Sequence, residues 1–325
     1  MEVSYLKGKR VVVTGGAGVI GRELLALLSH AGANVLSFDR RPLPKDMPGI
    51  SHAVIDLAAD DLARLRDFEP HVILHLAAAF ERSKESPGFW MVNWQDNTLL
   101  SHRVVDLARE LPGLEVFVFA SSYLIYSPSL YLSPSHRETA VYLKEEDPVS
   151  PRNLCGASKY YTEREIAFLR ETANPSLRTI CARIFRVYGC GSKDVVSRWV
   201  RASLSGQDIE VYNEENRFDY IFAADVAGGL LHLAASPRAQ GVVNLGSGSP
   251  RSIRDVLDNL AKSMKGFRPK MRVLKGVREP FEASCADITK LKEFTGWMPP
   301  TSLEEGIKAI VDYEQNRAKQ GIRDG

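Results

Sequence analysis

In the first half of the chain, short runs of apolar and β-branched residues alternate with longer segments in which apolar residues recur every three or four positions. The short runs predict buried strands and the longer segments predict amphipathic helices. We expect strands at Arg10–Thr14, Asn34–Asp39, Ala53–Ile55, His71–Leu76 and Val116–Ala120, and helices at Arg22–His30, Leu62–Phe68 and Asn93–Glu110. Apolar strands separated by helices predict an α/β fold with a doubly wound parallel sheet covered on both faces.

The pattern changes after a further apolar run at Thr179–Phe185. From there on, segments are shorter, glycine and proline are more frequent, and polar turns such as 246–250 appear. We therefore predict one domain over residues 1–185, which also takes in about 215–245, and a smaller mixed α/β domain over residues 186–325. The smaller domain is expected at the carboxyl edge of the sheet.

Composition narrows the classes of protein. Among 325 residues, 42 Lys and Arg stand against 40 Asp and Glu, a net charge of +2, so nucleic acid or an anionic membrane is not expected as a partner. No apolar run reaches the length of a membrane span, and the first residues lack the layout of a signal peptide. The four cysteines have no metal-ligand or disulfide spacing, which predicts a cytoplasmic protein without a metal site.

A glycine-rich turn follows the first expected strand. Gly15, Gly18 and Gly21 are spaced three residues apart, and Val19 and Ile20 can pack the new helix on the sheet. Glycines allow the backbone to approach a pyrophosphate, and the N–H groups at the helix start favour its negative charge. Because a strand precedes the turn and a helix follows it, this context predicts a dinucleotide site rather than a plain tight turn.

Acidic residues follow the second and third strands. Asp39 stands about 20 residues beyond the turn, where a carboxylate accepts hydrogen bonds from the adenosine ribose and repels a 2′-phosphate. NAD is therefore favoured over NADP, although Arg40 and Arg41 follow directly and could bind that phosphate. Asp56 and Leu57 could contact adenine, and a helix or turn cap is an equal interpretation of Asp56.

Eight short motifs are distributed over the chain. They are residues 14–21, 75–78, Ser121–Ser122 with Tyr126, and 156–159, followed by 183–189, 219–222, 244–248 and 296–299. Over nearly its whole length the chain thus resembles the extended short-chain dehydrogenase/reductase family, in particular its NAD-dependent nucleotide-sugar epimerases and dehydratases. The resemblance implies a Rossmann-type domain, a UDP-, GDP- or dTDP-linked sugar as substrate, and a homodimer formed through two long helices, here about Asn93–Glu110 and Ser158–Glu171.

The resemblance also implies roles for single residues. The residues expected to hold or line NAD are Gly15, Gly18, Val19, Ile20, Gly21, Asp39, Arg40, Asp56, Leu57, Leu76, Ala77 and Ala78. Lys159 is expected to bond the nicotinamide ribose, and Ser122 the sugar hydroxyl that is oxidised. Ser121 is expected to point the other way, because side chains alternate along a strand.

One position departs from the family signature Tyr-x-x-x-Lys, which here reads Cys155-Gly-Ala-Ser-Lys159. Helical spacing places positions 155 and 159 on one face. A phenol with a pKa of about 10 becomes a base near neutral pH when an ammonium group one turn away lowers that pKa. A cysteine sulfur lies nearer the backbone, and the gap it leaves holds roughly one water molecule.

Three interpretations of this position stay open. Cys155 acts as the base beside Lys159, directly or through a water molecule. Alternatively, another group has taken the role, for which Tyr123 is a candidate, while Tyr160 and Tyr161 are turned off the face. In the third interpretation the proton relay is lost, and Cys155 is a small buried filler.

The reaction type follows from what accompanies Ser122. Members that remove water carry Asp-Glu after this position, whereas Tyr123 follows here, which disfavours a dehydratase. Epimerisation through a transient keto-sugar is the simplest prediction. The alternatives are a catalytically impaired or silent protein that binds NAD and a nucleotide sugar, and a dehydrogenase, decarboxylase or dehydratase of the same family.

Arginines are the candidates for the substrate diphosphate, because guanidinium groups bind phosphates through paired hydrogen bonds. We expect Arg183, Arg186 and Arg278 to serve in this way. Arg186 stands where many family members have Asn. Arg217 lies one residue earlier than the family's arginine, and a surface salt bridge is as good an interpretation of it.

Overall fold

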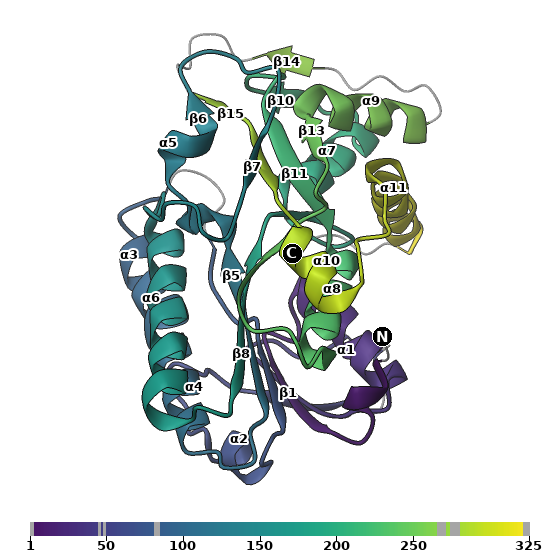
Figure 1. Cartoon of the computed structure of the whole chain (residues 1–325). Coiled ribbons are helices and arrows are strands. Elements are labelled where there is room, and N and C mark those ends of the chain that lie inside the picture. The colour runs from purple at the N-terminus through teal and green to yellow at the C-terminus, as the bar shows by residue number, and fades with distance from the viewer. Residues whose placement is uncertain are drawn as a thin grey trace.

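A seven-stranded parallel sheet forms the centre of the molecule (Figure 1). The computed structural model describes residues 3–44, 47, 50–80, 85–264, 271–273 and 280–320. The strands, in their order across the sheet, are β12 (Gly241–Leu245), β8 (Arg178–Ile184), β5 (Val116–Ser122), β4 (Val72–His75), β1 (Arg10–Thr14), β2 (Asn34–Asp39) and β3 (Ser51–Val54). The chain reverses its direction of winding between β1 and β4, which is where such sheets bind their ligands. The predicted doubly wound α/β fold is confirmed.

Helices cover both faces of this sheet and build two apolar cores. One face carries η1 (Val3–Leu6), α1 (Val19–His30), α8 (Ala223–Ala235) and α10 (Thr289–Thr295). The other face carries α2 (Ala63–Asp67), α4 (Leu100–Arg109), α6 (Leu154–Phe168) and the π-helical turn η4 (Leu169–Ala173). Neighbouring residues of one strand enter different cores, as Val11 and Val12 of β1 do, because side chains alternate across a sheet.

The helix predicted at 93–110 is made of several segments and is not one continuous α-helix. The range predicted as one helix, 93–110, consists of the end of α3 (Phe89–Asn93), a π-helical turn η2 (Trp94–Leu99) and α4. Within the turn, the amide of Asn97 holds both the N–H and the carbonyl of Ala79, at 2.7 and 3.0 Å. This long-range contact fixes a turn that the apolar periodicity alone does not predict.

A smaller unit lies beyond the carboxyl ends of the strands (Figure 1). It contains a three-stranded sheet of β13 (Pro250–Ser252), β11 (Arg217–Phe222) and β9 (Arg186–Tyr188), and the pair β10 (Ile209–Val211) and β14 (Met271–Val273). Helices α7 (Val195–Leu204), α9 (Ile253–Ser263) and α11 (Leu303–Lys319) share a third core with β9, β10 and β11. Between β11 and the later strands, α8 and β12 return to the large sheet, and the division into two domains stays a prediction.

Short elements join the two units. They are η3 (Tyr123–Ile125), α5 (Pro128–Tyr131), β6 (Leu132–Ser133) with its partner β15 (Phe281–Glu282), and β7 (Val141–Leu143) with its partner β16 (Ser284–Ala286). Asp219 fixes this junction, because its buried carboxylate accepts hydrogen bonds from the backbone N–H groups of Ser247, Gly248 and Ala286. Two of the late motifs of the sequence, 219–222 and 244–248, therefore meet at Asp219.

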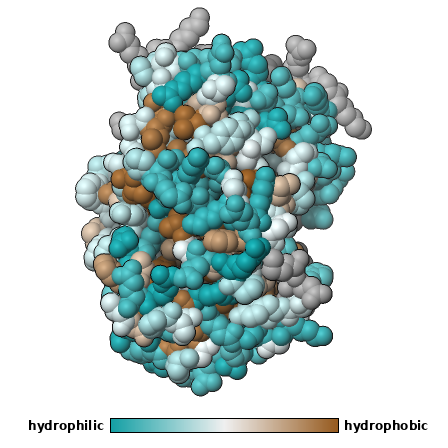
Figure 2. Space-filling view, viewed as in Figure 1, coloured by the Kyte–Doolittle hydropathy of each residue, from teal (hydrophilic) through white to brown (hydrophobic). Residues whose placement is uncertain are grey.

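The face shown in Figure 2 is mostly hydrophilic, with hydrophobic residues in small groups. Within the described part of the chain, no helix has the length and apolar character needed to cross a bilayer.

Candidate active site

The glycine turn is too tightly packed for side chains. Gly15 has a φ of +75°, and a Cβ there would lie 2.8 Å from the backbone nitrogen of Ala77. A Cβ on Gly21 would overlap the carbonyl oxygen of Gly15, and one on Gly18 would lie 3.0 Å from the same atom. Gly18 also leaves the start of α1 without a side-chain cap, so its first N–H groups face the turn. This cradle fits a pyrophosphate, because close backbone approach and a helix N-terminus are the features that such a group requires.

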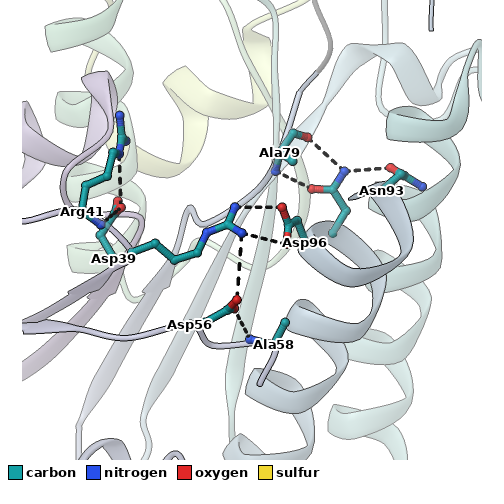
Figure 3. Close-up of polar contacts among 9 residues, drawn as sticks. Asp39, Arg41, Asp56, Ala58, Ala79, Asn93 and Asp96 are labelled. Carbon is teal, nitrogen blue, oxygen red and sulfur yellow. Dashed lines mark hydrogen bonds and ion pairs between the residues drawn. The ribbon is translucent and has the colours of Figure 1, made fainter. Parts of the chain in front are cut away.

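Asp39 closes the far side of the turn. Its carboxylate, at the end of β2, accepts a hydrogen bond from the N–H of Ala17 at 3.0 Å. The other oxygen accepts from the N–H of Arg41 at 3.0 Å, and the Arg41 side chain folds back on it, as Figure 3 shows. The guanidinium of Arg40 instead makes two hydrogen bonds with Asp96, at 2.8 and 3.2 Å. Both arginines that follow Asp39 are thus paired with acids.

Asp56 and Leu57, the two residues expected near adenine, differ in whether their side chains can reach a ligand. Asp56 caps the turn after β3 by accepting from the N–H of Ala58 at 2.9 Å, which agrees with the capping interpretation. Its second oxygen lies 4.0 Å from the guanidinium of Arg40. The Leu57 side chain is buried in the core beneath the sheet. Only its backbone could therefore face a coenzyme.

The loop that follows β4 is held by a short chain of hydrogen bonds. The hydroxyl of Thr14 accepts from the N–H groups of Leu76 and Ala77 at 3.2 Å, and it contacts Nδ1 of His75 at 2.6 Å. His75 is fully buried, and burial lowers its pKa to about 3, so it stays neutral. Leu76, Ala77 and the following Ala78 are thereby fixed opposite the glycine turn.

The end of β5 separates two neighbouring serines. Ser121 is buried and donates to Glu163 at 2.6 Å, whereas Ser122 faces the other side and caps η3 by accepting from the N–H of Leu124 at 3.2 Å. Glu163 also forms a buried ion pair with Arg183 at 2.9 Å. Arg183, expected at the diphosphate, is therefore committed to the interior, because separating a buried ion pair leaves an uncompensated charge.

The first turn of α6 brings positions 155 and 159 to the turn that follows Ser122. A Cβ on Gly156 would lie 2.6 Å from the carbonyl oxygen of Leu124, so helix and turn touch. Cys155 is 4% exposed and Lys159 is 7% exposed. The ammonium group of Lys159 donates to the carbonyl oxygen of Ala120 at 2.7 Å, which points it along the end of β5.

Burial shifts the pKa values of Lys159 and Cys155 in opposite directions. It lowers the pKa of Lys159 to about 8, because the charged ammonium is desolvated, and Cys155 and Glu163 counteract part of that shift. It raises the pKa of the Cys155 thiol, with Lys159 pulling the other way. At neutral pH the thiol therefore holds its proton, and the lysine is still mostly protonated.

Tyr123 is the other candidate base, and its hydroxyl is already engaged. It donates to the buried carboxylate of Glu282 at 3.2 Å, and its ring stacks on Phe185 with centroids 5.1 Å apart. Burial, and then the charge of Glu282, raise its pKa. A phenol in this state is less often in the phenolate form that accepts a proton, and its hydroxyl already donates to Glu282.

The substrate-side arginines lie on the strands of the smaller unit. Arg186 begins β9, and its guanidinium stacks 3.6 Å from the ring centroid of Phe218. Arg217 begins β11, and its buried Nε has no hydrogen-bond partner within the described residues, which is unusual for a guanidinium and suits an anionic ligand. Arg278 lies outside the described residues.

Sequence reasoning missed three acids at this site. Glu85 caps α6 by accepting from the N–H groups of Leu154 and Cys155, at 2.9 and 3.1 Å. Glu282 accepts from Tyr123 and pairs with Arg152 at 2.6 Å, and Asp96 holds Arg40. All three act on residues more than 50 positions away, so no local spacing announces them. In the described part of the chain, no group of His, Cys, Asp and Glu could hold a metal ion.

Comparison with known proteins agrees with this geometry. The model of the family described as "NAD dependent epimerase/dehydratase family" matches residues 11–246, and the chain belongs to that family.

Curated relatives include UDP-glucose 4-epimerase of Mycolicibacterium smegmatis, 27% identical over 95% of this chain and 100% of the relative. UDP-glucuronic acid decarboxylase 1 of Danio rerio is 26% identical over 94% of this chain and 72% of the relative. Among solved structures, MoeE5 in complex with UDP-glucose and NAD has a TM-score of 0.81 and 28% identity, and covers 95% of this chain and 99% of that one.

Proposed function

We propose that the protein is an enzyme that uses NAD to modify a UDP-linked sugar, and that the reaction is epimerisation through a transient keto-sugar. The observation that carries the proposal is the meeting of two features at one edge of the sheet. These are the cradle of Gly15, Gly18 and Gly21, and the corner where Ser122 and the first turn of α6 place a buried lysine. The relatives that bind or act on UDP-sugars support uridine as the nucleotide.

Each residue has a separate task in this proposal. Bound NAD would supply the hydride acceptor for oxidation of the sugar carbon. Ser122 orients the sugar hydroxyl, and Lys159 holds the nicotinamide ribose while its charge favours a base beside it. The thiolate form of Cys155 receives the hydroxyl proton, directly or through one water molecule, and returns it later. Because burial raises the pKa of this thiol, turnover at neutral pH is expected to be slow.

On the substrate side, Arg186 and Arg217 are proposed to bind the diphosphate, and Arg278 retains the same expected role. The Nε of Arg217, which has no hydrogen-bond partner among the described residues, supports this assignment. Asp39 is proposed to bond the adenosine ribose, and Asp56 the adenine.

A decarboxylase is the second candidate, favoured by the similarity to UDP-glucuronic acid decarboxylase 1. It shares the oxidation step and differs in losing carbon dioxide from a uronic acid. A dehydratase stays disfavoured by Tyr123.

We propose further that the chain forms a homodimer through α4 and α6. The outer faces of these helices form a shallow hollow rimmed by Tyr161 and Phe168, which are 49% and 53% exposed. Apolar exposure at neighbouring helical positions is typical of an interface. All four cysteines are free, which supports a location in the cytoplasm.

The test is incubation of the protein with NAD and a panel of UDP-, GDP- and dTDP-linked sugars, followed by separation and NMR of the products. We expect a 4-epimer from a UDP-sugar without net accumulation of reduced coenzyme. Release of carbon dioxide from UDP-glucuronic acid would select the decarboxylase. If no donor gives a product, with the wild type or with Cys155→Tyr, the protein is a silent binding homologue and the enzyme proposal is wrong.

A further inference from the structure

Asp39 is the carboxylate proposed to bond the adenosine ribose. Beside it, Arg40 could bind a 2′-phosphate, but its side chain is turned toward Asp96, an acid on a different element. Arg40 directly follows Asp39, and both nitrogens at the tip of its guanidinium bond the carboxylate of Asp96, at 2.8 and 3.2 Å. Asp56 lies on the other side, 4.0 Å from the same group. Figure 3 shows Asp56 and Asp96 facing a common point from two sides.

The pairing with Asp96 is the tighter of the two. The Asp96 side chain is 12% exposed, whereas that of Asp56 is 36% exposed. A two-pronged arginine–carboxylate pair restricts the guanidinium to one plane and direction, and partial burial reduces the screening of its charge by water. To reach a ligand at Asp39, Arg40 would first have to give up both hydrogen bonds.

The position of Asp96 is itself fixed by the loop that follows β4. Asp96 lies in the π-helical turn η2, and its neighbour Asn97 bonds the N–H and carbonyl of Ala79, in the loop that follows β4. The amide of Asn97 also donates to Asn93 at 2.7 Å, so the turn is clamped on both sides (Figure 3). Such turns are rare and frequently occur at functional sites.

We propose that Asp96 determines coenzyme specificity by holding Arg40 away from the 2′ position of the adenosine ribose. We limit the proposal to Arg40, because the Arg41 side chain is 67% exposed and contacts Asp39 only through its Nε, at 3.4 Å. A 2′-phosphate would therefore meet the carboxylate of Asp39 without Arg40 to neutralise it. The inference rests on the proposed binding of NAD and adds the residue that excludes NADP.

The experiment measures the dissociation constants of NAD and NADP by calorimetry for the full chain and its variants. Asp96→Asn removes the negative charge that holds Arg40, and the ratio of the NADP constant to the NAD constant should fall about tenfold, the value of roughly one charge-assisted hydrogen bond. The double variant Asp96→Asn with Arg40→Leu should return the ratio to that of the wild type. Glu110→Gln is the matched control, because it removes a carboxylate from the exposed Arg66 pair and should leave the ratio unchanged.

A second variant keeps the proposal testable if Asp96→Asn does not fold. Arg40→Leu in the wild-type background should change the ratio less than about twofold, because a held Arg40 contributes nothing to phosphate binding. A marked rise of the ratio in Arg40→Leu would show that Arg40 already binds the phosphate and would overturn the proposal. An unchanged ratio in folded Asp96→Asn, or a fall that persists in the double variant, would do the same.

These outcomes are separate from a failure of the proposed function. A wild type that binds NAD while the ratios contradict the proposal leaves the enzyme assignment intact. A wild type that binds neither coenzyme overturns both.

Discussion

The glycine turn at the start of α1 and the corner where Cys155 meets Lys159 lie at the same edge of one sheet, yet they follow the family pattern to different degrees. At the turn, all three expected glycines are present, and a Cβ on Gly15 or Gly21 would overlap backbone atoms. At the corner, the lysine is kept and buried, but a thiol with a raised pKa stands where the family has a phenol. In the proposed function, the turn serves coenzyme binding and position 155 serves proton transfer, so these two parts can diverge separately.

The largest effect is expected from removing the lysine of the corner. Lys159→Met removes the ribose contact and the charge that opposes the raised pKa of Cys155, so kcat should fall about 10³-fold. The NAD dissociation constant, set mainly at the turn, should change less than about tenfold. Steady-state kinetics and calorimetry check both values, with the exposed Lys262→Met as control. A Lys159→Met variant that keeps more than a tenth of the activity would remove the lysine from the chemistry.

The same lysine gives the molecule a pH dependence of stability. In the unfolded chain its pKa is about 10.4, and in the folded chain burial lowers it to about 8. Between these values the unfolded state binds more protons, so the contribution to stability increases as the pH rises from about 8 to 10.4.

The free energy of unfolding of the wild type, minus that of Lys159→Met, should therefore rise by about 3 kcal/mol across this window. Urea unfolding at several pH values measures it, and the subtraction cancels the tyrosines and other cysteines. A difference that is flat with pH would mean that the lysine is solvated in the folded protein.

At the glycine turn, one methyl group should be enough to weaken coenzyme binding. Gly15→Ala forces a left-handed backbone on alanine and places its Cβ 2.8 Å from Ala77, which should cost about 2 kcal/mol of NAD affinity, or about thirtyfold. Gly113→Ala is the matched control, because a Cβ there meets nothing within 4 Å. Equal affinities of the two variants would show that the coenzyme does not lie across this turn.

The smallest effect is expected at the position that departs from the family. Cys155→Tyr supplies a longer proton carrier beside Lys159 and should raise kcat about tenfold. Cys155→Ala separates the interpretations of the thiol, since a thiol that carries the proton predicts loss of activity in this variant. If the folded tyrosine variant is slower than the wild type, the corner has been rebuilt around cysteine.

Much of the cradle could be predicted from local sequence. Strands β1 and β2 begin and end where the apolar runs do, and Asp39 is placed by its distance from the turn. The departure at Cys155 is equally visible in the sequence. These features depend on neighbours within one strand–turn–helix unit, which periodicity and spacing describe well.

Contacts across the fold could not be predicted in this way. Arg183 was expected at the diphosphate, and it is buried with Glu163 because its strand position points it into the interior. The pairing of Arg40 with Asp96 depends on a π-helical turn that is set by the loop after β4. Such pairs join elements that only the folded sheet brings together.

The central claim is that one NAD lies across the glycine turn of each chain. Equilibrium dialysis of the purified protein against labelled NAD, after any coenzyme released by denaturation has been counted, tests it directly. We predict one bound NAD per chain and a large loss of binding in Gly15→Ala. A folded wild type that neither retains NAD nor releases any on denaturation would contradict the account.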